Sequence, residues 1–278
     1  MKLKDTYLKK KYLKFFNYDQ FKYNFVVTDL KFGYSEIYNV LKSRKYKNIL
    51  EIGSGTGLLL NELQKSYPKF FFVGIDPGES GFHNYKQILL KIEKLNKKTK
   101  FYKKNIINYK TQKKFDLIFS FNVFEHIKNQ KKFLKKIYSL LNKNGKIIIY
   151  APNYDFPYEP HFVLPIIFNK KLTKIFFKKK ILSHELKTKE KGLWQGLNLT
   201  GVTKIKKFLK DNNMDYFFDR KIKNVMINRI FTDKTFYKRQ GLAAKITKLA
   251  FRMGLDKLFF DFLKIPFPYF KLIIKKTK

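Results

Sequence analysis

The sequence predicts an α/β fold in which a doubly wound, mostly parallel sheet is covered by helices. From Lys47 onward, short apolar runs alternate with amphipathic stretches, which is the pattern of repeated strand–helix–strand units. A glycine-rich loop follows the first run and precedes a helical pattern, as at the ligand-binding edge of such sheets. The 278 residues suit one domain of this class with insertions.

The elements are expected in the following order. Residues 1–46 form a helical N-terminal extension, in which Ser35 is the expected cap of a helix that runs toward Lys45. The main domain is expected over 47–278, with strands at 48–52, 70–75, 99–102, 115–121 and 146–150. Helices are expected at 58–64, at 85–95 and along the face shared by Phe133 and Leu141, with Asn144 and Gly145 as the stop of the last one.

The second half is expected to carry two insertions. The first, at about 154–198, mixes aromatic residues, prolines and lysines and is expected to be rich in loops, although it is too apolar for a solvated linker. A helix at 200–210 and a strand at 216–218 follow, and the second insertion covers about 222–266. Its segment 242–263 is amphipathic and basic, which favours a helix packed on the core and also permits contact with a membrane.

The composition is strongly basic. Lys and Arg number 61 against 21 Asp and Glu, so the formal net charge is +40, and this field would attract phosphates, anionic lipids or acidic saccharides. The residues in excess also have A/T-rich codons, so genomic bias is an equally weighted explanation. The absence of Cys excludes disulfides and thiolate zinc sites.

The predicted location is cytoplasmic. The N-terminus lacks the apolar stretch of a secretory signal, and no apolar run approaches the roughly 18 residues that span a bilayer. A peripheral position on the inner face of the membrane is the second expected location.

The strongest motif is the loop that contains Gly53, Gly55 and Gly57. Its third glycine falls one residue too early for a dinucleotide fingerprint, and no Lys-Ser/Thr pair of a P-loop follows. Glu51 before the turn suits a cationic amino group better than a pyrophosphate, because a carboxylate repels phosphates. Asp76 ends the second strand, where a carboxylate can accept hydrogen bonds from ribose hydroxyls. S-adenosylmethionine (SAM) has an ammonium, a sulfonium and a ribose.

Residues 48–153 resemble the class I SAM-dependent methyltransferases, in particular a bacterial branch that includes ubiquinone-pathway and saccharide-modifying enzymes. The motifs are Glu51-Ile-Gly53-Ser-Gly55-Thr-Gly57, Val73-Gly-Ile-Asp76, Phe115-Asp-Leu-Ile-Phe-Ser-Phe-Asn122-Val-Phe-Glu125-His126-Ile and Ile149-Tyr-Ala-Pro152-Asn153. The resemblance implies a Rossmann-like sheet of seven strands whose last strand, at 269–275, is antiparallel.

The resemblance also implies roles for particular residues. Glu51, Gly53, Gly55 and Gly57 would hold the methionine end of SAM, and Asp76 would hold the ribose. Asn105 occupies the position of an adenine contact, and its amide oxygen can accept that hydrogen bond. Phe121 and Asn122 would line the methyl-donating face.

The candidate catalytic residues are His126, His161 and Glu125, because histidine titrates nearest neutrality and Glu125 precedes His126 directly. The competing interpretation of Glu125 and His126 is a capping or packing pair, and that of His161 is an ordinary loop histidine. No metal is expected, because Asn122 stands where some ubiquinone-pathway relatives have an acidic residue.

Three functions remain open. The favoured one is methyl transfer from SAM to a small-molecule or saccharide acceptor, including lipid-linked or nucleotide-linked ones. The second is methylation of RNA or another nucleic acid, which the basic charge favours, although 122–125 lack the tetrad of base amino methylases. The third is a non-catalytic protein with the SAM-binding fold at a membrane surface.

Overall fold

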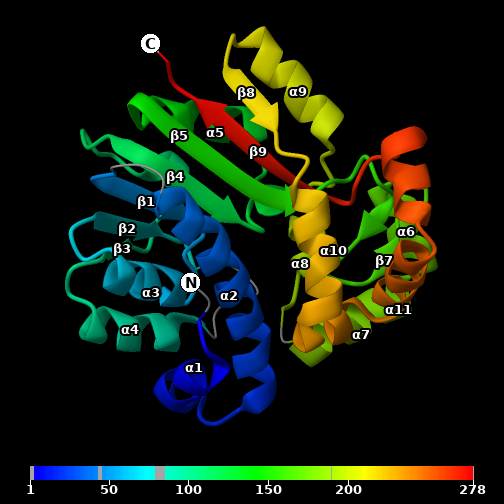
Figure 1. Cartoon of the computed structure of the whole chain (residues 1–278), viewed down its shortest axis with the longest axis horizontal. Helices are drawn as coiled ribbons and strands as arrows, with labels where there is room; N and C mark the ends of the chain where they lie inside the picture. Colours follow the sequence, from blue (N-terminus) through cyan, green and yellow to red (C-terminus); the bar gives the residue numbers. More distant parts are fainter. Residues whose placement is uncertain (1–2, 43–45, 79–84, 189, 278) are drawn as a thin grey trace. The chain divides into compact units, whose positions relative to one another are not determined.

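The computed structural model describes residues 3–42, 46–78, 85–188 and 190–277 (Figure 1). Within this part of the chain, seven strands form one sheet in the order β3-β2-β1-β4-β5-β9-β8. Strand β1 (Asn48–Ile52) is parallel to β2 (Phe71–Ile75) and to β4 (Phe115–Phe121), and β2 is parallel to β3 (Lys100–Tyr102). The last strands are antiparallel, so the predicted Rossmann-like fold class is confirmed.

The chain divides into two compact units. The first comprises residues 1–121, 132–148 and 275–278, and the second comprises 122–131 and 149–274. Besides the four strands above, the first unit holds α1 (Asp5–Tyr12), η1 (Leu13–Phe16), α2 (Gln20–Lys42), α3 (Leu58–Ser66), α4 (Tyr85–Leu95) and η2 (Ile106–Asn108). Helix α5 (Gln130–Ser139) and strands β5 (Leu141–Pro152) and β9 (Tyr269–Lys275) contain residues of both units.

The second unit holds the remaining elements. They are η3 (Phe124–His126), β6 (Tyr158–Glu159), β7 (Leu164–Pro165), α6 (Lys170–Phe176), α7 (Lys178–Thr188), α8 (Leu193–Gly196), α9 (Val202–Asp211), β8 (Asp215–Phe218), α10 (Ile222–Thr232), α11 (Lys234–Arg252) and the π-helix η4 (Lys257–Phe262). No helix in the described ranges is long and apolar enough to cross a membrane.

The central strands form because their sequences are almost continuously apolar. In β1, β2 and β4 most residues are buried, as expected for parallel strands covered on both faces. Strand β4 and helix α4 have the predicted bounds, and β2 and β3 each begin one residue later than predicted. The apolar runs and their glycine, proline or asparagine boundaries therefore located these elements.

The predicted end of the helix after β4 is wrong. Helix α5 ends at Ser139, and β5 already begins at Leu141. Asn144 and Gly145, predicted to stop the helix, lie within β5, where Asn144 donates its backbone N–H to the carbonyl of Lys276 at 2.7 Å. Apolar residues near 141 suit a helix or a strand equally well, and pairing with the C-terminal segment selects the strand.

The predicted cap at Ser35 is also wrong. Helix α2 begins at Gln20, so Ser35 lies in its interior, and the expected end at Lys45 lies outside the described residues. The helix extends farther back because Tyr23, Val27 and Leu30 continue its buried face.

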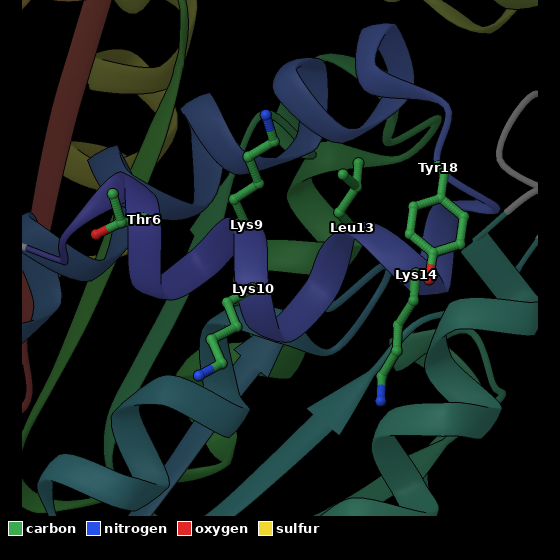
Figure 2. Close-up of a pocket in the computed structure, with 6 residues that line it drawn as sticks. All are labelled: Thr6, Lys9, Lys10, Leu13, Lys14 and Tyr18. Atoms are coloured by element: carbon green, nitrogen blue, oxygen red, sulfur yellow. The ribbon is translucent and has the colours of Figure 1, made fainter.

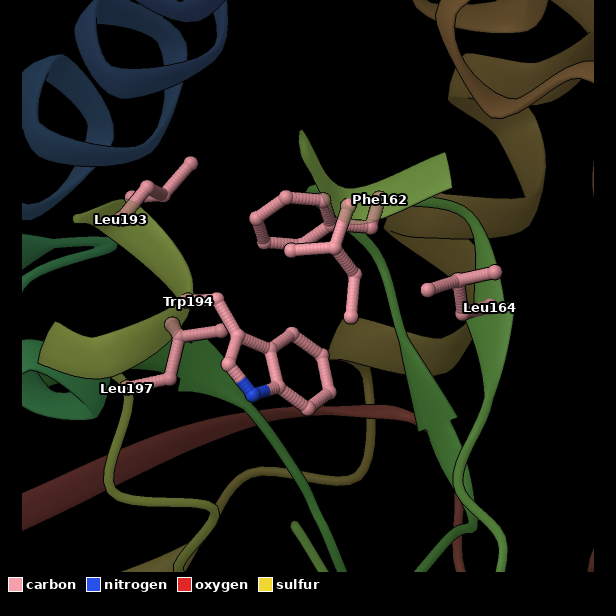
Figure 3. Packing of buried hydrophobic residues seen from close by; sticks show 6 residues of the cluster. Phe162, Leu164, Leu193, Trp194 and Leu197 are labelled. Carbon is pink, nitrogen blue, oxygen red and sulfur yellow. The ribbon is translucent and has the colours of Figure 1, made fainter. Parts of the chain in front are cut away.

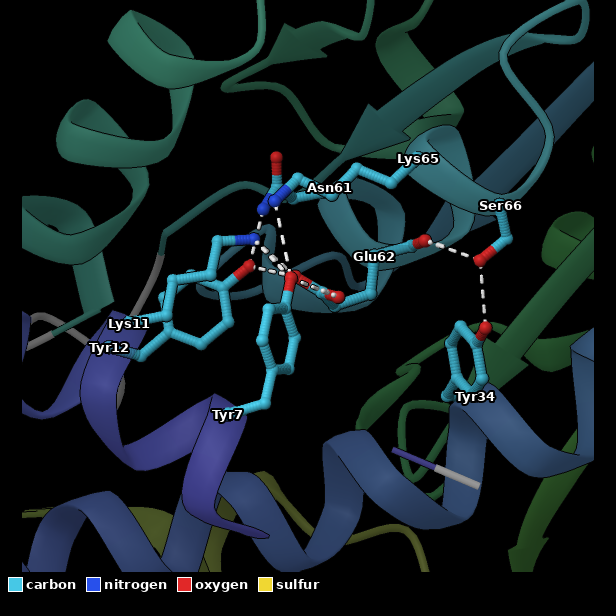
Figure 4. Close-up of polar contacts among 8 residues, drawn as sticks. All are labelled: Tyr7, Lys11, Tyr12, Tyr34, Asn61, Glu62, Lys65 and Ser66. Atoms are coloured by element: carbon cyan, nitrogen blue, oxygen red, sulfur yellow. Dashed lines mark hydrogen bonds and ion pairs between the residues drawn. The ribbon is translucent and has the colours of Figure 1, made fainter. Parts of the chain in front are cut away.

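Helix α1 is fixed to α3 by a buried polar cluster (Figure 4). Glu62, only 3% exposed, accepts hydrogen bonds from the hydroxyls of Tyr7, at 3.1 Å, and Tyr12, and it pairs with Lys11 at 2.5 Å. Asn61 donates to the hydroxyl of Tyr12. Burial, followed by the neighbouring Lys65, lowers the pKa of Lys11 to about 8 despite this pairing.

A surface hollow of about 450 Å³ lies along α1 and η1 (Figure 2). It is lined by Thr6, Lys9, Lys10, Leu13, Lys14 and Tyr18. None of the residues predicted to bind a cofactor or to act in catalysis lines this hollow.

The segment at 154–198 contains more regular structure than predicted. It forms β6, β7, α6, α7 and α8 around a small core of its own (Figure 3). Trp194 is 2% exposed, and its ring meets that of Phe162 edge to face at 5.5 Å. Leu164, Ile181 and Leu197 complete this packing, so Trp194 is a core residue.

Candidate active site

The glycine loop connects β1 to α3. Gly53 and Ser54 donate their backbone N–H groups to the carbonyl of Ile75, at 2.7 and 3.3 Å, so the loop is fastened to the end of β2. Gly55 has φ +47 and Gly57 has φ +72, conformations that L side chains rarely adopt. A Cβ atom at Gly57 would also lie 2.9 Å from the side chains of Leu89 and Phe101.

Glu51 lies in β1 and is paired in register with Gly74 of β2 and Phe119 of β4. Its side chain is buried, and no described residue forms a hydrogen bond with its Oε2 atom. The buried hydroxyl of Ser54 likewise has no hydrogen-bond partner in the described chain. Burial and the nearby charge of Asp76 raise the pKa of Glu51 well above its ordinary value. A buried carboxyl of this kind is expected to have a polar partner, and a cationic ligand would supply it.

Asp76 follows β2 directly, and its carboxylate holds the glycine loop through a hydrogen bond. Its Oδ2 atom accepts the N–H of Gly55 at 2.9 Å, and its Oδ1 atom accepts the N–H of Gly78 at 2.8 Å. Each carboxylate oxygen keeps a further acceptor position. The structure therefore brings Asp76, Glu51 and the glycine loop together in the first unit.

Asn105 lies in the loop after β3, and Phe121 ends β4, both in the first unit. The Asn105 side-chain oxygen accepts the N–H of Ile107 at 3.0 Å and thereby caps η2. Phe121 ends β4, and its ring meets that of Phe32 from α2 edge to face at 5.5 Å. A Cβ atom at Gly33 would lie 3.3 Å from the Phe121 ring, so α2 approaches this strand end closely. The sequence pattern did not predict that α2 lies close to the end of β4.

The second unit begins at Asn122, which adopts φ 52 immediately after β4. Its N–H donates to the carbonyl of Tyr150 at 2.9 Å, and its Oδ1 accepts the hydroxyl of Tyr269 at 2.8 Å. These contacts hold Asn122 between the ends of β5 and β9.

The three candidate catalytic side chains lie close together in the second unit. His161 Nε2 is 3.8 Å from Glu125 Oε1, and the rings of His161 and His126 have centroids 5.4 Å apart. Glu125 is 1% exposed, and neither of its carboxyl oxygens has a hydrogen-bond partner among the described residues. Asn198 donates to the carbonyls of Phe124 and Ile127 and thereby holds η3, which carries Glu125 and His126.

Glu159 orients His161. Its Oε1 is 2.6 Å from His161 Nδ1 and accepts the hydroxyl of Tyr154 at 3.2 Å, and its Oε2 accepts the N–H of Phe162 at 2.8 Å. Glu159 is completely buried. The sequence placed Glu159 near His161 along the chain but did not reveal this pairing.

The environment of this cluster shifts the pKa values of Glu125, His126 and His161 in different directions. Burial raises the pKa of Glu125 to about 7, although the His161 charge opposes this shift. Burial, followed by the His161 charge, lowers the pKa of His126 to about 3. Burial disfavours a charged His161, but the Glu159 carboxylate prevails and raises its pKa to about 9. Near neutral pH, His161 is therefore a cation, His126 is neutral and Glu125 can take up or release a proton.

Glu125, His126 and His161 also offer ligand atoms that lie within 4.8 Å of one another. Two ligands of one zinc ion at about 2.1 Å can be at most about 4.2 Å apart. The three ligand atoms, up to 4.8 Å apart, are thus spaced too widely for one zinc ion to bind all of them without a movement of the side chains.

The family of the chain follows from its sequence and fold together. Residues 33–208, more than half of the chain, match the model of a family described as a methyltransferase domain. The fold is that of the class I SAM-dependent methyltransferases, as the sequence predicts. The chain belongs to this methyltransferase family.

Two relatives illustrate the similarity in sequence. An uncharacterised protein of Mycobacterium tuberculosis is 31% identical over 195 residues, which are 69% of this chain and 66% of that protein. Malonyl-(acyl-carrier protein) O-methyltransferase 1 of Ilyobacter polytropus is 35% identical over 105 residues, 38% of each chain. The chain therefore spans only part of the length of both relatives.

Two solved structures share the fold. The plantazolicin methyltransferase BpumL, in complex with a triazolic desmethylPZN analogue and S-adenosylhomocysteine, has a TM-score of 0.51 at 16% identity, over 98% of this chain and 91% of that one. Phosphoethanolamine N-methyltransferase 2 of Haemonchus contortus, in complex with SAM, has a TM-score of 0.50 at 15% identity, over 84% of this chain and 50% of that one.

Proposed function

We propose that the chain transfers the methyl group of SAM to a small-molecule or saccharide acceptor, including lipid-linked or nucleotide-linked ones. The observation that carries this proposal is Glu51, a buried carboxyl whose Oε2 atom has no hydrogen-bond partner in the described chain. It lies in the strand that ends at the glycine loop. The ammonium group of SAM would complete its hydrogen bonding, and the cation would stabilise the ionised carboxylate.

The remaining cofactor roles follow from the first unit. Asp76 keeps acceptor positions for ribose hydroxyls while it holds the loop through Gly55. The loop glycines bring backbone N–H groups close to the ligand without Cβ atoms in between. Asn105 is proposed at the adenine, and Phe121 and Asn122 at the methyl-donating face. SAM, when bound, supplies an activated methyl group.

In the second unit, Glu125 is the proposed proton acceptor for the nucleophile of the methyl acceptor. Its pKa of about 7 matches the value at which a general base works best near neutral pH. His161 is held as a cation by Glu159 and is better placed to stabilise negative charge than to take up a proton. His126 is too weakly basic, with its pKa lowered to about 3.

The names of the similar methyltransferases favour an acceptor other than a nucleic acid. The named methyltransferases are described with malonyl-acyl-carrier protein, plantazolicin and phosphoethanolamine, none of which is a nucleic acid. The net charge of +40 would equally attract a phosphorylated saccharide or a lipid headgroup. A lipid-linked acceptor is favoured if the protein works at a membrane surface.

Calorimetric titration of the full chain with SAM tests the cofactor assignment. We expect a dissociation constant in the micromolar range, which corresponds to a binding free energy of about −8 kcal/mol. Because burial and the Asp76 charge raise the pKa of Glu51 and the SAM ammonium would lower it, binding should release protons, which is measured as a dependence of the heat on the ionisation enthalpy of the buffer.

Two variants sharpen this experiment. Glu51→Gln should weaken binding by about tenfold or more, since a charged hydrogen bond is lost, and it should abolish proton release. Glu93→Gln on α4 removes a partly exposed carboxylate and should bind SAM like the native chain. Failure of the native chain to bind SAM would overturn the proposal.

The acceptor is then sought with radiolabelled SAM and cell extracts separated into glycans, lipids and RNA. Label in the glycan or lipid fraction is expected. Label confined to RNA would instead favour the nucleic-acid function.

A further inference from the structure

Helix α11 presents a row of apolar side chains to solvent. The helix bends at Gly241, where φ 53 and ψ −125 are not helical. After the bend, Leu242, Ile246, Leu249 and Met253 follow at helical spacing and share one side. Their exposed fractions are 68%, 60%, 61% and 64%. We call these four residues the α11 stripe.

The opposite side of the helix contacts α10, although Phe251 on it is itself 41% exposed. Ala244 is 1% exposed, and the ring of Phe251 meets that of Phe231 on α10 at 5.4 Å. The Lys248 ammonium lies 5.3 Å from the centre of the Phe231 ring. Helix α11 is therefore held against α10 by its other side, and the α11 stripe is not needed to fix it there.

Exposed apolar side chains continue beyond α11. In and next to η4, Leu258, Phe259, Phe262 and Leu263 are 42%, 37%, 76% and 52% exposed. A monomeric soluble protein rarely exposes so many large apolar residues in one short segment without a partner.

The charges of the same segment indicate what that partner is. Lys245 and Arg252 lie along one edge of the α11 stripe, and Lys257 and Lys264 follow it. Residues 242–264 contain five basic and two acidic side chains. One acidic residue, Asp261, is already paired with Lys223 at 2.9 Å. The segment thus combines an apolar row with unneutralised positive charge.

We propose that residues 242–264 form a docking surface for an anionic lipid bilayer, on which the α11 stripe lies in the interface and the flanking cations meet lipid phosphates. An apolar face bordered by Lys and Arg is the pattern of helices that lie in the membrane interface. A second copy of this chain is disfavoured on this surface, because each copy has a net charge of +40 and the approaching surfaces are both basic. The surface is independent of the proposed methyl transfer.

Cosedimentation with vesicles tests the proposal. The full chain should bind vesicles of phosphatidylcholine with about one third phosphatidylserine at least about tenfold more tightly than pure phosphatidylcholine vesicles, because anionic lipid attracts basic segments. The double variant Ile246→Asp/Leu249→Asp and the triple variant Lys245→Glu/Arg252→Glu/Lys257→Glu should each weaken binding by about tenfold or more.

Matched controls separate this surface from general basicity. The variant Lys94→Glu/Lys97→Glu/Lys98→Glu makes the same charge change in the first unit, and Ile175→Asp/Leu186→Asp changes two residues that are 62% and 79% exposed. Both should bind vesicles like the native chain.

Three outcomes would overturn the proposal. They are equal binding to both kinds of vesicle, equal loss of binding in the controls, and a native dimer that the α11-stripe variant dissociates without any change in vesicle binding. An unchanged circular dichroism spectrum and an unchanged urea midpoint in the variants exclude misfolding, and this control does not depend on the cofactor assignment.

Discussion

The buried cluster in the second unit shows how neighbouring side chains can have very different proton affinities. Burial alone would raise the pKa of Glu159, but the His161 charge, with hydrogen bonds from His161 and from the Phe162 N–H, holds it below the ordinary value. Its charge is therefore permanent at neutral pH, and it keeps His161 protonated. Glu125 is equally buried but lies farther from His161, at 3.8 Å, so burial prevails and raises its pKa to about 7. At equal burial, the closer His161 charge and the added hydrogen bonds separate the pKa of Glu159 from that of Glu125.

The raised pKa of Glu125 predicts a pH-dependent stability. The folded pKa is about 7 and the ordinary value is 4.5, so the folded chain holds a proton that the unfolded chain releases between these values. This contribution to stability is complete below about pH 4.5 and is lost as the pH rises through about 7. Glu125→Gln mimics the protonated carboxyl at every pH. The variant should gain stability over the native chain across this range, on the order of 3 kcal/mol above it.

Urea unfolding at several pH values between about 5 and 8 measures this difference. Glu93→Gln serves as the control, since this carboxylate is 32% exposed, and its curve should run parallel to that of the native chain. Parallel curves for Glu125→Gln would show that Glu125 is ionised throughout.

Most residues proposed to bind the cofactor could be predicted from the sequence. Carboxyl ends of parallel strands meet at one edge of a sheet, so Glu51, Gly55 and Asp76 could be expected near one another. The hydrogen bond from Gly55 to Asp76 confirms that expectation for these two residues. The pairing of Glu159 with His161 could not be predicted, because it depends on how the segment after β5 folds near η3.

At the scale of elements, α1 is joined to the sheet-covering helix α3 by few but buried contacts. Tyr12 is fully buried, and its hydroxyl lies between Glu62 and Asn61. Burial and the Glu62 charge raise the pKa of Tyr12, so the hydroxyl remains a donor at all relevant pH values. Tyr12 is thus the most deeply buried polar contact between α1 and α3.

Tyr12→Phe should destabilise the chain by about 1–3 kcal/mol, because Glu62 and Asn61 lose a buried hydrogen-bond partner. The free energy of unfolding in urea is the measurement. Tyr18→Phe is the matched control, since Tyr18 is 72% exposed, and its effect should stay within about 0.5 kcal/mol. Equal values for the two variants would contradict the role of this cluster.

Element boundaries were predictable only where the sequence contains a stop. Helix α4 and strand β4 match their predicted bounds, because polar or turn-forming residues flank their apolar patterns. The start of α2 and the change from α5 to β5 were predicted wrongly. At the first place no stop signal marks the start of the helix, and at the second Asn144 and Gly145 suggest a stop but lie within a strand, so contacts distant in sequence decide the conformation.

At the scale of the whole molecule, the net charge of +40 acts against the folded state through self-repulsion. Salt screens this repulsion over about 10 Å at 0.1 M. The thermal midpoint should therefore rise by several degrees between about 0.05 and 0.5 M sodium chloride.

Thermal unfolding followed by circular dichroism checks this prediction. The variant Lys94→Gln/Lys97→Gln/Lys98→Gln has three fewer positive charges and should show a smaller rise. A midpoint that stays constant or falls with salt would mean that the charges are distributed so that repulsion is negligible.

The sequence by itself determined the fold class, the glycine loop and the pair Glu51 and Asp76. These features depend on local periodicity and on the rule that parallel strands end at one edge. Only the tertiary structure decided which side chains of the second unit meet, that Trp194 belongs to a small separate core, and that the α11 stripe faces solvent. Those outcomes depend on packing between segments far apart in the chain, and a helical pattern does not reveal which of its apolar residues find a partner.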